Sequence, residues 1–190
     1  MERLQQFLSK FIQLEQPALS ALLNLFQEKQ LKKKTYLASY GEHSKKMAFM
    51  LSGVMRAFYQ NDKGEQYNKT FFIENDFVGA YSSLVTGQKN LIDIQCLTDC
   101  TLLLADYQAF TKLYDRFPKI ERIARIIAEQ YFVSKEKREI ELVTLDAKAR
   151  YQIFQKEYPN LDQRIPQYYI ASYLGVTPTQ LSRIRAQKSS

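Results

Sequence analysis

The strongest candidate chemistry in this sequence is recognition of a polyanion by side chains near the C-terminus. Thr179, Gln180, Ser182 and Arg183 place four hydrogen-bonding side chains within five positions. Arginine can bind guanine, and glutamine adenine, through two parallel hydrogen bonds. We therefore expect Arg183 to contact a base, and the other three to contact bases or phosphates. The expected contact set also includes Thr177, together with Arg185 and Lys188 as phosphate-binding residues.

Two short helices are expected to position these side chains. The first begins near Pro166, buries Ile170, Ala171 and Leu174, and stops at Gly175, which tolerates the left-handed backbone of a helix end. The second starts at the N-cap Thr177, with Pro178 in its first turn and Gln180 completing a capping box. Leu181 and Ile184 should face the first helix. This pattern predicts a helix-turn-helix, whose second helix enters the major groove of DNA. The alternative is an ordinary helical hairpin with a charged face.

The charge distribution agrees with a polyanion partner at this end. The 190 residues carry a net charge of +7. Residues 1–110 hold 12 basic and 11 acidic residues, whereas residues 111–190 hold 15 basic and 9 acidic ones. After Asp162, the last acid, come only Arg164, Arg183, Arg185 and Lys188 among charged residues. A basic end beside a near-neutral body indicates a polyanion partner or a solvated surface, and charge alone does not separate the two.

The chain length and composition favour a cytoplasmic globular protein of one domain or two small ones. No apolar stretch is long enough for a membrane span, and the N-terminus lacks the apolar core of a signal peptide. Two cysteines do not form a disulfide scaffold. We expect Cys96 and Cys100 to be buried structural residues, with a redox pair as the less favoured alternative.

Hydrophobic periodicity divides the chain into three parts. Residues 4–30 have helical spacing, and residues 35–107 contain short apolar runs separated by turn signals, which predicts an antiparallel barrel or sandwich. After a short helix within 107–114, Pro118 begins a helix expected to end near Thr144. Its stripe of apolar residues has steps of three and four, so we expect it to pair with a second copy of the chain. The stripe consists of Ile120, Ile123, Ala124, Ile127 and Tyr131. The alternative is that it packs on its own barrel.

These features and their order resemble the Crp/Fnr superfamily of bacterial transcription regulators. The resemblance rests on the runs 50–56 (MLSGVMR), 75–79 (NDFVG), 96–100 (CLTDC) and 170–185, with Leu174-Gly175 and Leu181-Ser182-Arg183 the most telling. It implies an α+β chain with an N-terminal antiparallel β-roll (jelly-roll-like) and flanking helices. The implied domains are a cyclic-nucleotide-binding-like effector domain at 1–117, a dimerisation helix at 118–144 and a DNA-binding domain at 145–190. The family adds a wing hairpin that residues 186–190 are too short to form, so phosphate anchoring is expected from the helices and the Arg164 region.

Two departures from the family pattern concern the effector. Cyclic-nucleotide-binding members carry a glutamate after the glycine matched by Gly79, and an arginine about ten residues later. Here these places hold Ala80 and Asn90, with Lys89 as a neighbouring cation. Because an enclosed cyclic phosphate needs a cation or several donors, we expect neither cyclic AMP nor cyclic GMP to bind tightly. The candidate pocket comprises Phe71, Gly79, Ala80, Tyr81, Lys89 and Asn90, and the resemblance adds Tyr131.

The sequence therefore predicts a homodimeric regulator that acts by binding. No nucleophile–base pair, metal-ligand cluster or phosphate loop is apparent, so we expect neither catalysis nor a metal, and no cofactor beyond an unknown small effector. The expected partners are double-stranded DNA and a second copy, with RNA polymerase as a further candidate and no membrane. The rival hypothesis is a ligand-binding or protein-interaction β-roll with a vestigial helix-turn-helix.

Overall fold

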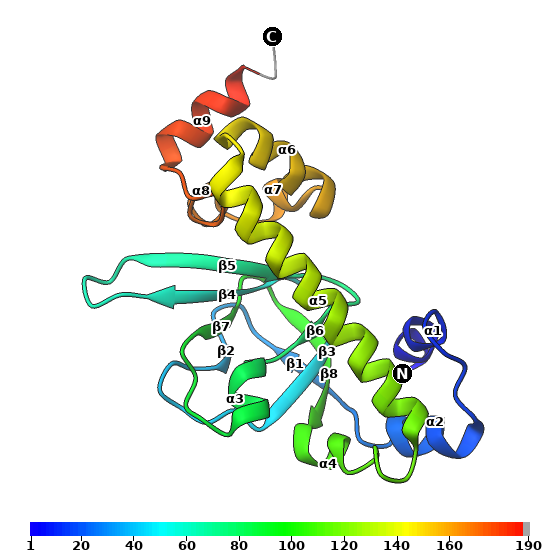
Figure 1. Cartoon of the computed structure of the whole chain (residues 1–190). Coiled ribbons are helices and arrows are strands. Elements are labelled where there is room, and N and C mark those ends of the chain that lie inside the picture. Colours follow the sequence, from blue (N-terminus) through cyan, green and yellow to red (C-terminus); the bar gives the residue numbers. More distant parts are fainter. Residues whose placement is uncertain (188–190) are drawn as a thin grey trace. The chain divides into compact units, whose positions relative to one another are not determined.

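The computed structural model describes residues 1–187 and has the α+β architecture expected from the sequence (Figure 1). Two four-stranded sheets form the β-roll, with strand orders β1-β8-β3-β6 and β2-β7-β4-β5. The strands are β1 (Gln27–Leu31), β2 (Tyr36–Ala38), β3 (Lys46–Ser52), β4 (Met55–Gln60), β5 (Gln66–Phe72), β6 (Phe77–Val78), β7 (Asp93–Cys96) and β8 (Cys100–Asp106).

Nine helices lie within the described residues. Helices α1 (Glu2–Ser9) and α2 (Gln16–Leu23) precede the strands, α3 (Tyr81–Thr86) lies between β6 and β7, and α4 (Tyr107–Thr111) follows β8. After it come α5 (Pro118–Thr144), α6 (Ala147–Glu157), α7 (Leu161–Arg164), α8 (Gln167–Leu174) and α9 (Pro178–Ala186). The chain forms two compact units, one of residues 1–57 and 71–130, the other of residues 58–70 with the chain from Tyr131 onward.

One error in the sequence prediction concerns residues 27–31. We expected helix over 4–30, but α2 ends at Leu23 and Gln27–Leu31 forms strand β1. This strand pairs antiparallel with β8, from Gln27 opposite Leu104 to Leu31 opposite Cys100. Its first four side chains are polar and exposed, so local periodicity gives little sign of a strand. Ladder bonds to a buried neighbour decide the conformation instead.

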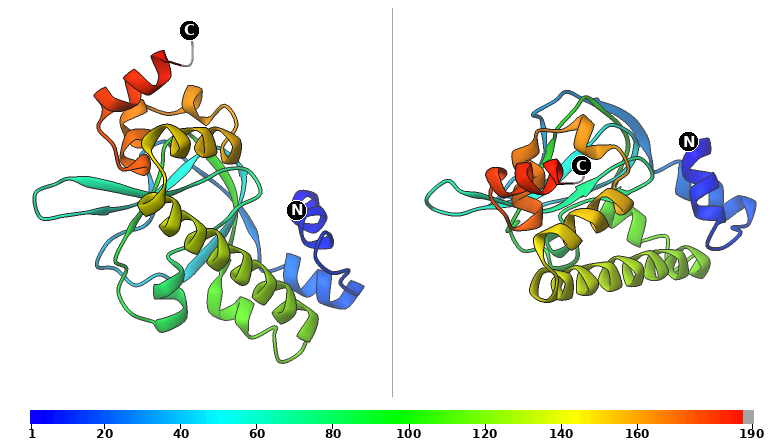
Figure 2. Two further views of the ribbon diagram at one scale, coloured as in Figure 1. Left: turned by 45° about the horizontal axis from the view of Figure 1, so that its top comes forward. Right: turned by 90° about the horizontal axis from the view of Figure 1, so that it is seen from above.

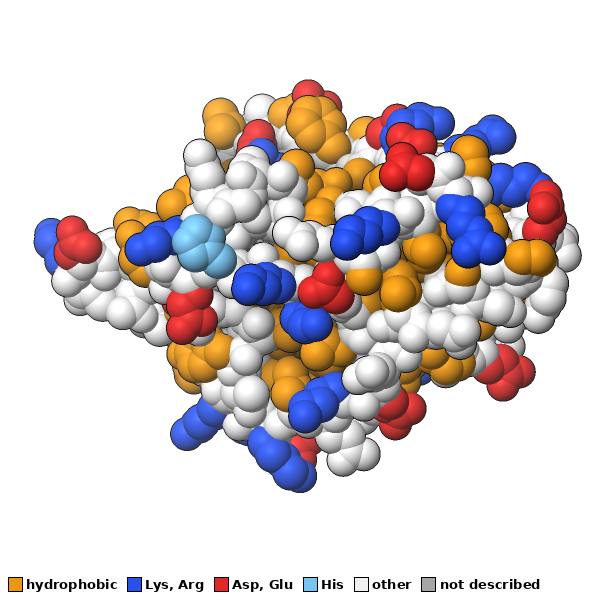
Figure 3. Space-filling model, turned by 90° about the horizontal axis from the view of Figure 1, so that it is seen from below, with side chains coloured by type: hydrophobic (Ala, Val, Ile, Leu, Met, Phe, Trp, Pro, Cys, Tyr) orange, Lys and Arg blue, Asp and Glu red, His pale blue; other side chains and the backbone are white. Residues whose placement is uncertain are grey.

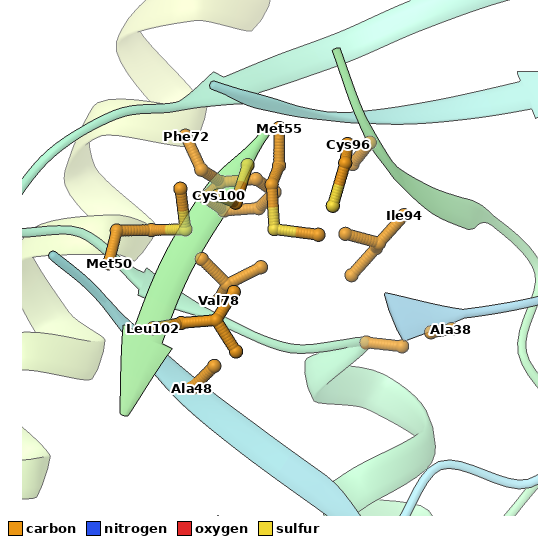
Figure 4. Packing of buried hydrophobic residues seen from close by; sticks show 12 residues of the cluster. Ala38, Ala48, Met50, Met55, Phe72, Val78, Ile94, Cys96, Cys100 and Leu102 are labelled. Atoms are coloured by element: carbon orange, nitrogen blue, oxygen red, sulfur yellow. The ribbon is translucent and has the colours of Figure 1, made fainter. Parts of the chain in front are cut away.

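The interior of the β-roll is filled by the chain's own apolar side chains (Figure 4). Strands contribute alternate residues to this core because successive side chains point to opposite faces of a sheet. Its largest buried members are Met50, Met55, Phe72, Ile94 and Leu102. Both cysteines belong to it, and both are free and buried, as expected.

A second core joins the N-terminal helices to the outer side of the roll. Leu4 and Leu22, from α1 and α2, pack with Phe49 and Phe110. Arg3 adds polar anchors, donating from Nε to Asn75 Oδ1 (2.8 Å) and from Nη1 to the carbonyl of Leu51 (2.7 Å).

The long helix has the bounds predicted from the sequence, but its apolar stripe is used differently. Ile120 and Ile123 are 1% and 3% exposed within the single chain, because they pack into the second core beside α1 and α2. Ala124 and Ile127 are partly buried there as well. The expectation that these four residues form an open dimer face is therefore wrong for Ile120 and Ile123. The N-terminal helices already remove these two side chains from water, so their burial does not require a second copy of the chain.

A different part of α5 leaves apolar side chains open. Phe132, Val133, Ile140 and Val143 are 64%, 61%, 56% and 87% exposed. At 100° per residue these four positions lie within one face of the helix. We call them the exposed stripe. Tyr131, 43% exposed, belongs to the same unit but lies outside this face. In residues 1–187, none of the helices combines the length and apolar character that crossing a bilayer demands.

Candidate nucleic-acid interface

Helices α8 and α9 form the predicted helix-turn-helix (Figure 2). Gly175 ends α8 with φ +67°, a left-handed conformation that favours glycine. The Val176 amide then donates to the carbonyl of Ala171 (3.0 Å), which closes the turn. Ile170, Ala171, Leu174 and Leu181 are fully buried, so the apolar faces of the two helices meet as expected.

The capping box predicted at the start of α9 is present. The Gln180 amide donates to Thr177 Oγ1 (3.2 Å), and the Thr177 amide donates to Gln180 Oε1 (2.9 Å). The side-chain oxygen of Gln180 thus serves the cap, as does the Thr177 hydroxyl. Base contacts by these two residues stay predictions. Within residues 1–187 the Nε2 group of Gln180 forms no hydrogen bond, so it can still act as a donor.

Three of the predicted contact residues present an open face. Thr179, Ser182 and Arg183 are exposed and lie at positions i, i+3 and i+4 of α9, which places them side by side. Within residues 1–187 the Arg183 side chain forms neither a hydrogen bond nor an ion pair, whereas its backbone carbonyl accepts from the Gln187 amide. An unpaired guanidinium beside two hydroxyl-bearing residues suits the donor and acceptor edges of a DNA groove.

Arg185 differs from the expectation that it faces outward. Its side chain is partly buried on the inner side of α9, next to Tyr151. Burial and a hydrogen bond to Asp162 raise the pKa of Tyr151, and the positive charge of Arg185 opposes that rise. The helical period explains the difference, because position 185 lies nearer to the buried Leu181 than to Arg183 around the helix. Lys188 lies outside the described residues.

An aromatic core supports the helix-turn-helix from beneath. Helix α6 packs against both α8 and α9. Phe154 contacts Tyr173 with ring centroids 5.7 Å apart, and Tyr158 contacts Tyr173 at 5.9 Å. Arg138 of α5 lies over the Tyr173 ring, 3.4 Å from its centroid, and also donates to the Tyr173 carbonyl. The second half of the long helix is thereby attached to α8.

The β4–β5 hairpin also contacts α8, and residue patterns along the chain do not indicate this contact. Strand β5 lies at the open edge of its sheet. The Ser172 hydroxyl accepts from the Asn68 amide (3.0 Å) and donates to the carbonyl of Gln66 (2.8 Å), so it replaces a missing neighbour strand. Asn68 Nδ2 donates to the carbonyl of Tyr169 (2.8 Å). We refer to these bonds as the hairpin contact.

The predicted effector residues are divided between buried and exposed positions. Phe71, Ala80 and Asn90 are about 2% exposed, whereas Tyr81 is 58% exposed and Lys89 is also exposed. Gly79 is partly buried, and a Cβ there would lie 2.8 Å from Leu84 Cδ1. Tyr131 belongs to the other compact unit.

Asn90, at the place of the family's phosphate-binding arginine, is committed to a turn. Its side-chain amide donates to the carbonyl of Ser39 (2.9 Å), and its backbone amide to the carbonyl of Glu42 (2.7 Å). Its own carbonyl accepts from the Gly41 amide (2.9 Å). A buried, neutral residue held in this way brings no cation toward the interior of the roll.

One face of the molecule carries charges of both signs (Figure 3). On the face seen from below, basic and acidic side chains are interspersed (Figure 3). Such mixing gives short-range ion pairs, among them Lys46 with Asp106 at 3.5 Å. Interspersed charges of this kind produce no concentrated field for a polyanion.

Comparisons with known proteins agree with this architecture. Residues 28–117 match the family model of the cyclic nucleotide-binding domain. FixK2 from Bradyrhizobium japonicum is similar in structure with a TM-score of 0.76 and 16% identity, over 85% of this chain and 83% of that one. CLP from Xanthomonas campestris, described as a c-di-GMP-responsive global regulator, gives a TM-score of 0.71 at 16% identity and 92% coverage of both chains.

A third neighbour is a putative regulator of the Crp/Fnr family from Eubacterium rectale, with a TM-score of 0.69, 12% identity, and coverage of 92% of this chain and 83% of that one. A comparison with curated proteins yields no match. Residues 28–117 thus resemble a cyclic nucleotide-binding domain, and the chain shares its fold with these solved structures.

Proposed function

We propose that this protein is a cytoplasmic DNA-binding transcription regulator of the Crp/Fnr type that acts by binding rather than by catalysis. The observation that carries the proposal is the exposed, unpaired Arg183 beside Thr179 and Ser182, on a helix with a complete capping box. In a helix-turn-helix, this part of the second helix faces the base edges of the major groove. The excess of basic over acidic residues in the second half of the chain adds long-range attraction to phosphates.

The regulator is proposed to act as a homodimer through the exposed stripe of α5. Four large apolar side chains on one face of one helix are costly to leave in water. In a twofold dimer, the exposed stripe of each protomer would pack against the same stripe of the other. Two recognition helices would then read a near-palindromic site with half-sites about 34–36 Å apart. This stripe replaces the one built on Ile120 and Ile123.

Cyclic AMP is proposed not to control this regulator. A bound cyclic nucleotide needs partners for its ribose hydroxyl and its phosphate, and the positions that match those partners hold the buried Ala80 and the turn-bound Asn90, respectively. Isothermal titration calorimetry with cyclic AMP and cyclic GMP tests this directly. The expected result is no heat of binding at micromolar concentrations, and a micromolar dissociation constant for either nucleotide would refute the proposal.

The central experiment is selection of bound duplexes from a random pool, followed by fluorescence anisotropy on the selected sequence. We expect a twofold-symmetric motif and an affinity that falls steeply with salt. Arg183→Ala should weaken binding at least about 30-fold, since a bidentate base contact contributes about 1–3 kcal/mol and the substitution removes one contact from each half of the dimer. Arg116→Ala is the matched control, because it removes the same charge from a surface site outside the helix-turn-helix. Weak, salt-independent binding that ignores both substitutions would favour the rival hypothesis of a vestigial helix-turn-helix.

A further inference from the structure

Four of the six sulfur-containing side chains of this protein gather in the core of the β-roll. Met50 lies on β3, Met55 on β4, Cys96 ends β7 and Cys100 begins β8. Each is at most 3% exposed. Figure 4 shows their sulfur atoms turned toward the middle of the cluster, next to Phe72. We call these four residues the sulfur cluster.

The topology of the roll explains why the two cysteines meet. Strands β7 and β8 belong to different sheets, so the three residues between them carry the chain across the roll. The Leu97 amide holds this turn by donating to the carbonyl of Val54 (2.8 Å). The Cys100 thiol points inward and approaches the carbonyls of Val54 (3.5 Å) and Thr98 (3.4 Å). Both thiols therefore face the interior that the two methionines also fill.

The Cys96 and Cys100 thiols lie within hydrogen-bonding reach of each other. A hydrogen bond from the Cys96 thiol lowers the pKa of Cys100, and the same bond raises the pKa of Cys96. A metal ligand must be deprotonated, so Cys100 is the natural anionic donor of the cluster.

We propose that the sulfur cluster binds one soft monovalent metal ion, of the Cu(I) or Ag(I) class. Thiolate and thioether donors select soft ions over Mg²⁺, Ca²⁺ or Mn²⁺, which prefer oxygen. Charge also favours a monovalent ion, because one thiolate and one single positive charge give a neutral buried site. A divalent ion would leave a net charge in an apolar interior, which is costly.

The reaction on binding is a simple exchange of a proton for the ion. The S–H bond of Cys100 breaks, a bond from its sulfur to the metal forms, and the proton goes to solvent. No electron is transferred. Met50 and Met55 donate sulfur lone pairs, and Cys96 keeps its proton and its hydrogen bond to the Cys100 sulfur. Three sulfurs around one ion, each about 2.3 Å from it, would lie about 4 Å from one another.

Ion binding would join strands of both sheets and so stabilise the folded roll. The site itself does not depend on the proposed DNA binding. A signalling role for the site does depend on the proposed DNA binding, because the signal would be a change in DNA affinity when metal binds. The two statements can be tested separately. Among the described residues, no three His, Cys, Asp or Glu side chains assemble as a metal site; the sulfur cluster differs because two of its three proposed donors are thioethers.

The test is anaerobic titration of the full-length reduced protein with Cu(I), and separately with Ag(I), against a competing chelator. We expect one ion per chain, release of about one proton per ion at neutral pH, and a sulfur-to-metal charge-transfer band in the ultraviolet. Cys100→Ser should abolish competitive binding. Met50→Leu and Met55→Leu, which keep the core volume, should each weaken binding tenfold or more.

Met47→Leu is the matched control, because Met47 lies on the same strand as Met50 but packs in the other core. Circular dichroism and thermal unfolding of every apo variant check that the fold survives. Unchanged affinity in both methionine variants, two ions per chain, or competitive binding retained by Cys100→Ser would each overturn the proposal. DNA titrations with and without Cu(I) then report on signalling. Metal binding without any DNA binding would contradict the proposed function but would still support the metal site.

Discussion

The hairpin contact gives the sharpest prediction about this molecule. Ser172→Ala removes the hydroxyl that accepts from the Asn68 amide and donates to the Gln66 carbonyl. Asn68 is 5% exposed, so its amide loses a partner in a place where water does not readily replace it. An unsatisfied buried donor costs about 1–3 kcal/mol. The Gln66 carbonyl, on an exposed residue, can turn to water and contributes little.

The magnitude follows from what stays folded when the hairpin detaches. Helix α8 remains a helix in both states, so the better helix propensity of alanine cancels in the local opening equilibrium. A cost of about 2 kcal/mol therefore appears in full and raises the opening constant about 30-fold. In global unfolding the same propensity gain, about 0.5 kcal/mol, partly offsets the loss.

Amide hydrogen exchange followed by NMR measures this opening at single residues. The Asn68 amide should exchange about 30 times faster in Ser172→Ala than in the wild type. Ser172→Thr keeps a hydroxyl and should retain most of the protection. Ser134→Ala, the same substitution at an exposed position of α5, should leave Asn68 unaffected. Equal protection in Ser172→Ala and the wild type would refute the reasoning.

Three further predictions concern stability and assembly. Burial raises the pKa of Asp76 from 3.8 to about 6. The hydrogen bond from the Ile73 amide lowers this pKa, and the nearby Glu74 charge raises it further. The native state therefore holds the Asp76 proton more tightly than the unfolded chain does. In urea titrations the free energy of unfolding should consequently fall by up to about 3 kcal/mol as the pH rises from 4 to 6. Asp76→Asn should make the free energy of unfolding less dependent on pH in this range, and an equal pH dependence in the variant would contradict the role of Asp76. Thr177→Ala should cost about 1 kcal/mol of stability by removing the N-cap of α9, seen as a lower Tm, whereas an unchanged Tm would show the cap to be dispensable. Val143→Asp should shift sedimentation toward the monomer, while Ser134→Asp on another face of α5 should not, and a dimer that tolerates Val143→Asp would exclude the exposed stripe as the interface.

The sequence alone determined the features that depend on local backbone chemistry. The helix-turn-helix could be predicted because Gly175, Thr177, Pro178 and Gln180 each satisfy a specific requirement of a helix end. The bounds of α5 followed in the same way, from Pro118 at its start and an uninterrupted helical run after it. These signals are local, so tertiary context did not alter them.

Tertiary structure decided which surfaces are covered. Periodicity showed that Ile120 and Ile123 share a face, but only the folded chain shows that the N-terminal helices cover it. The strand at Gln27–Leu31 and the meeting of four sulfur side chains depend likewise on partners far away in the chain. Whether a residue is buried depends on contacts with residues far away in the chain. A local pattern shows which residues share a face of a helix or strand, but it does not show what packs against that face.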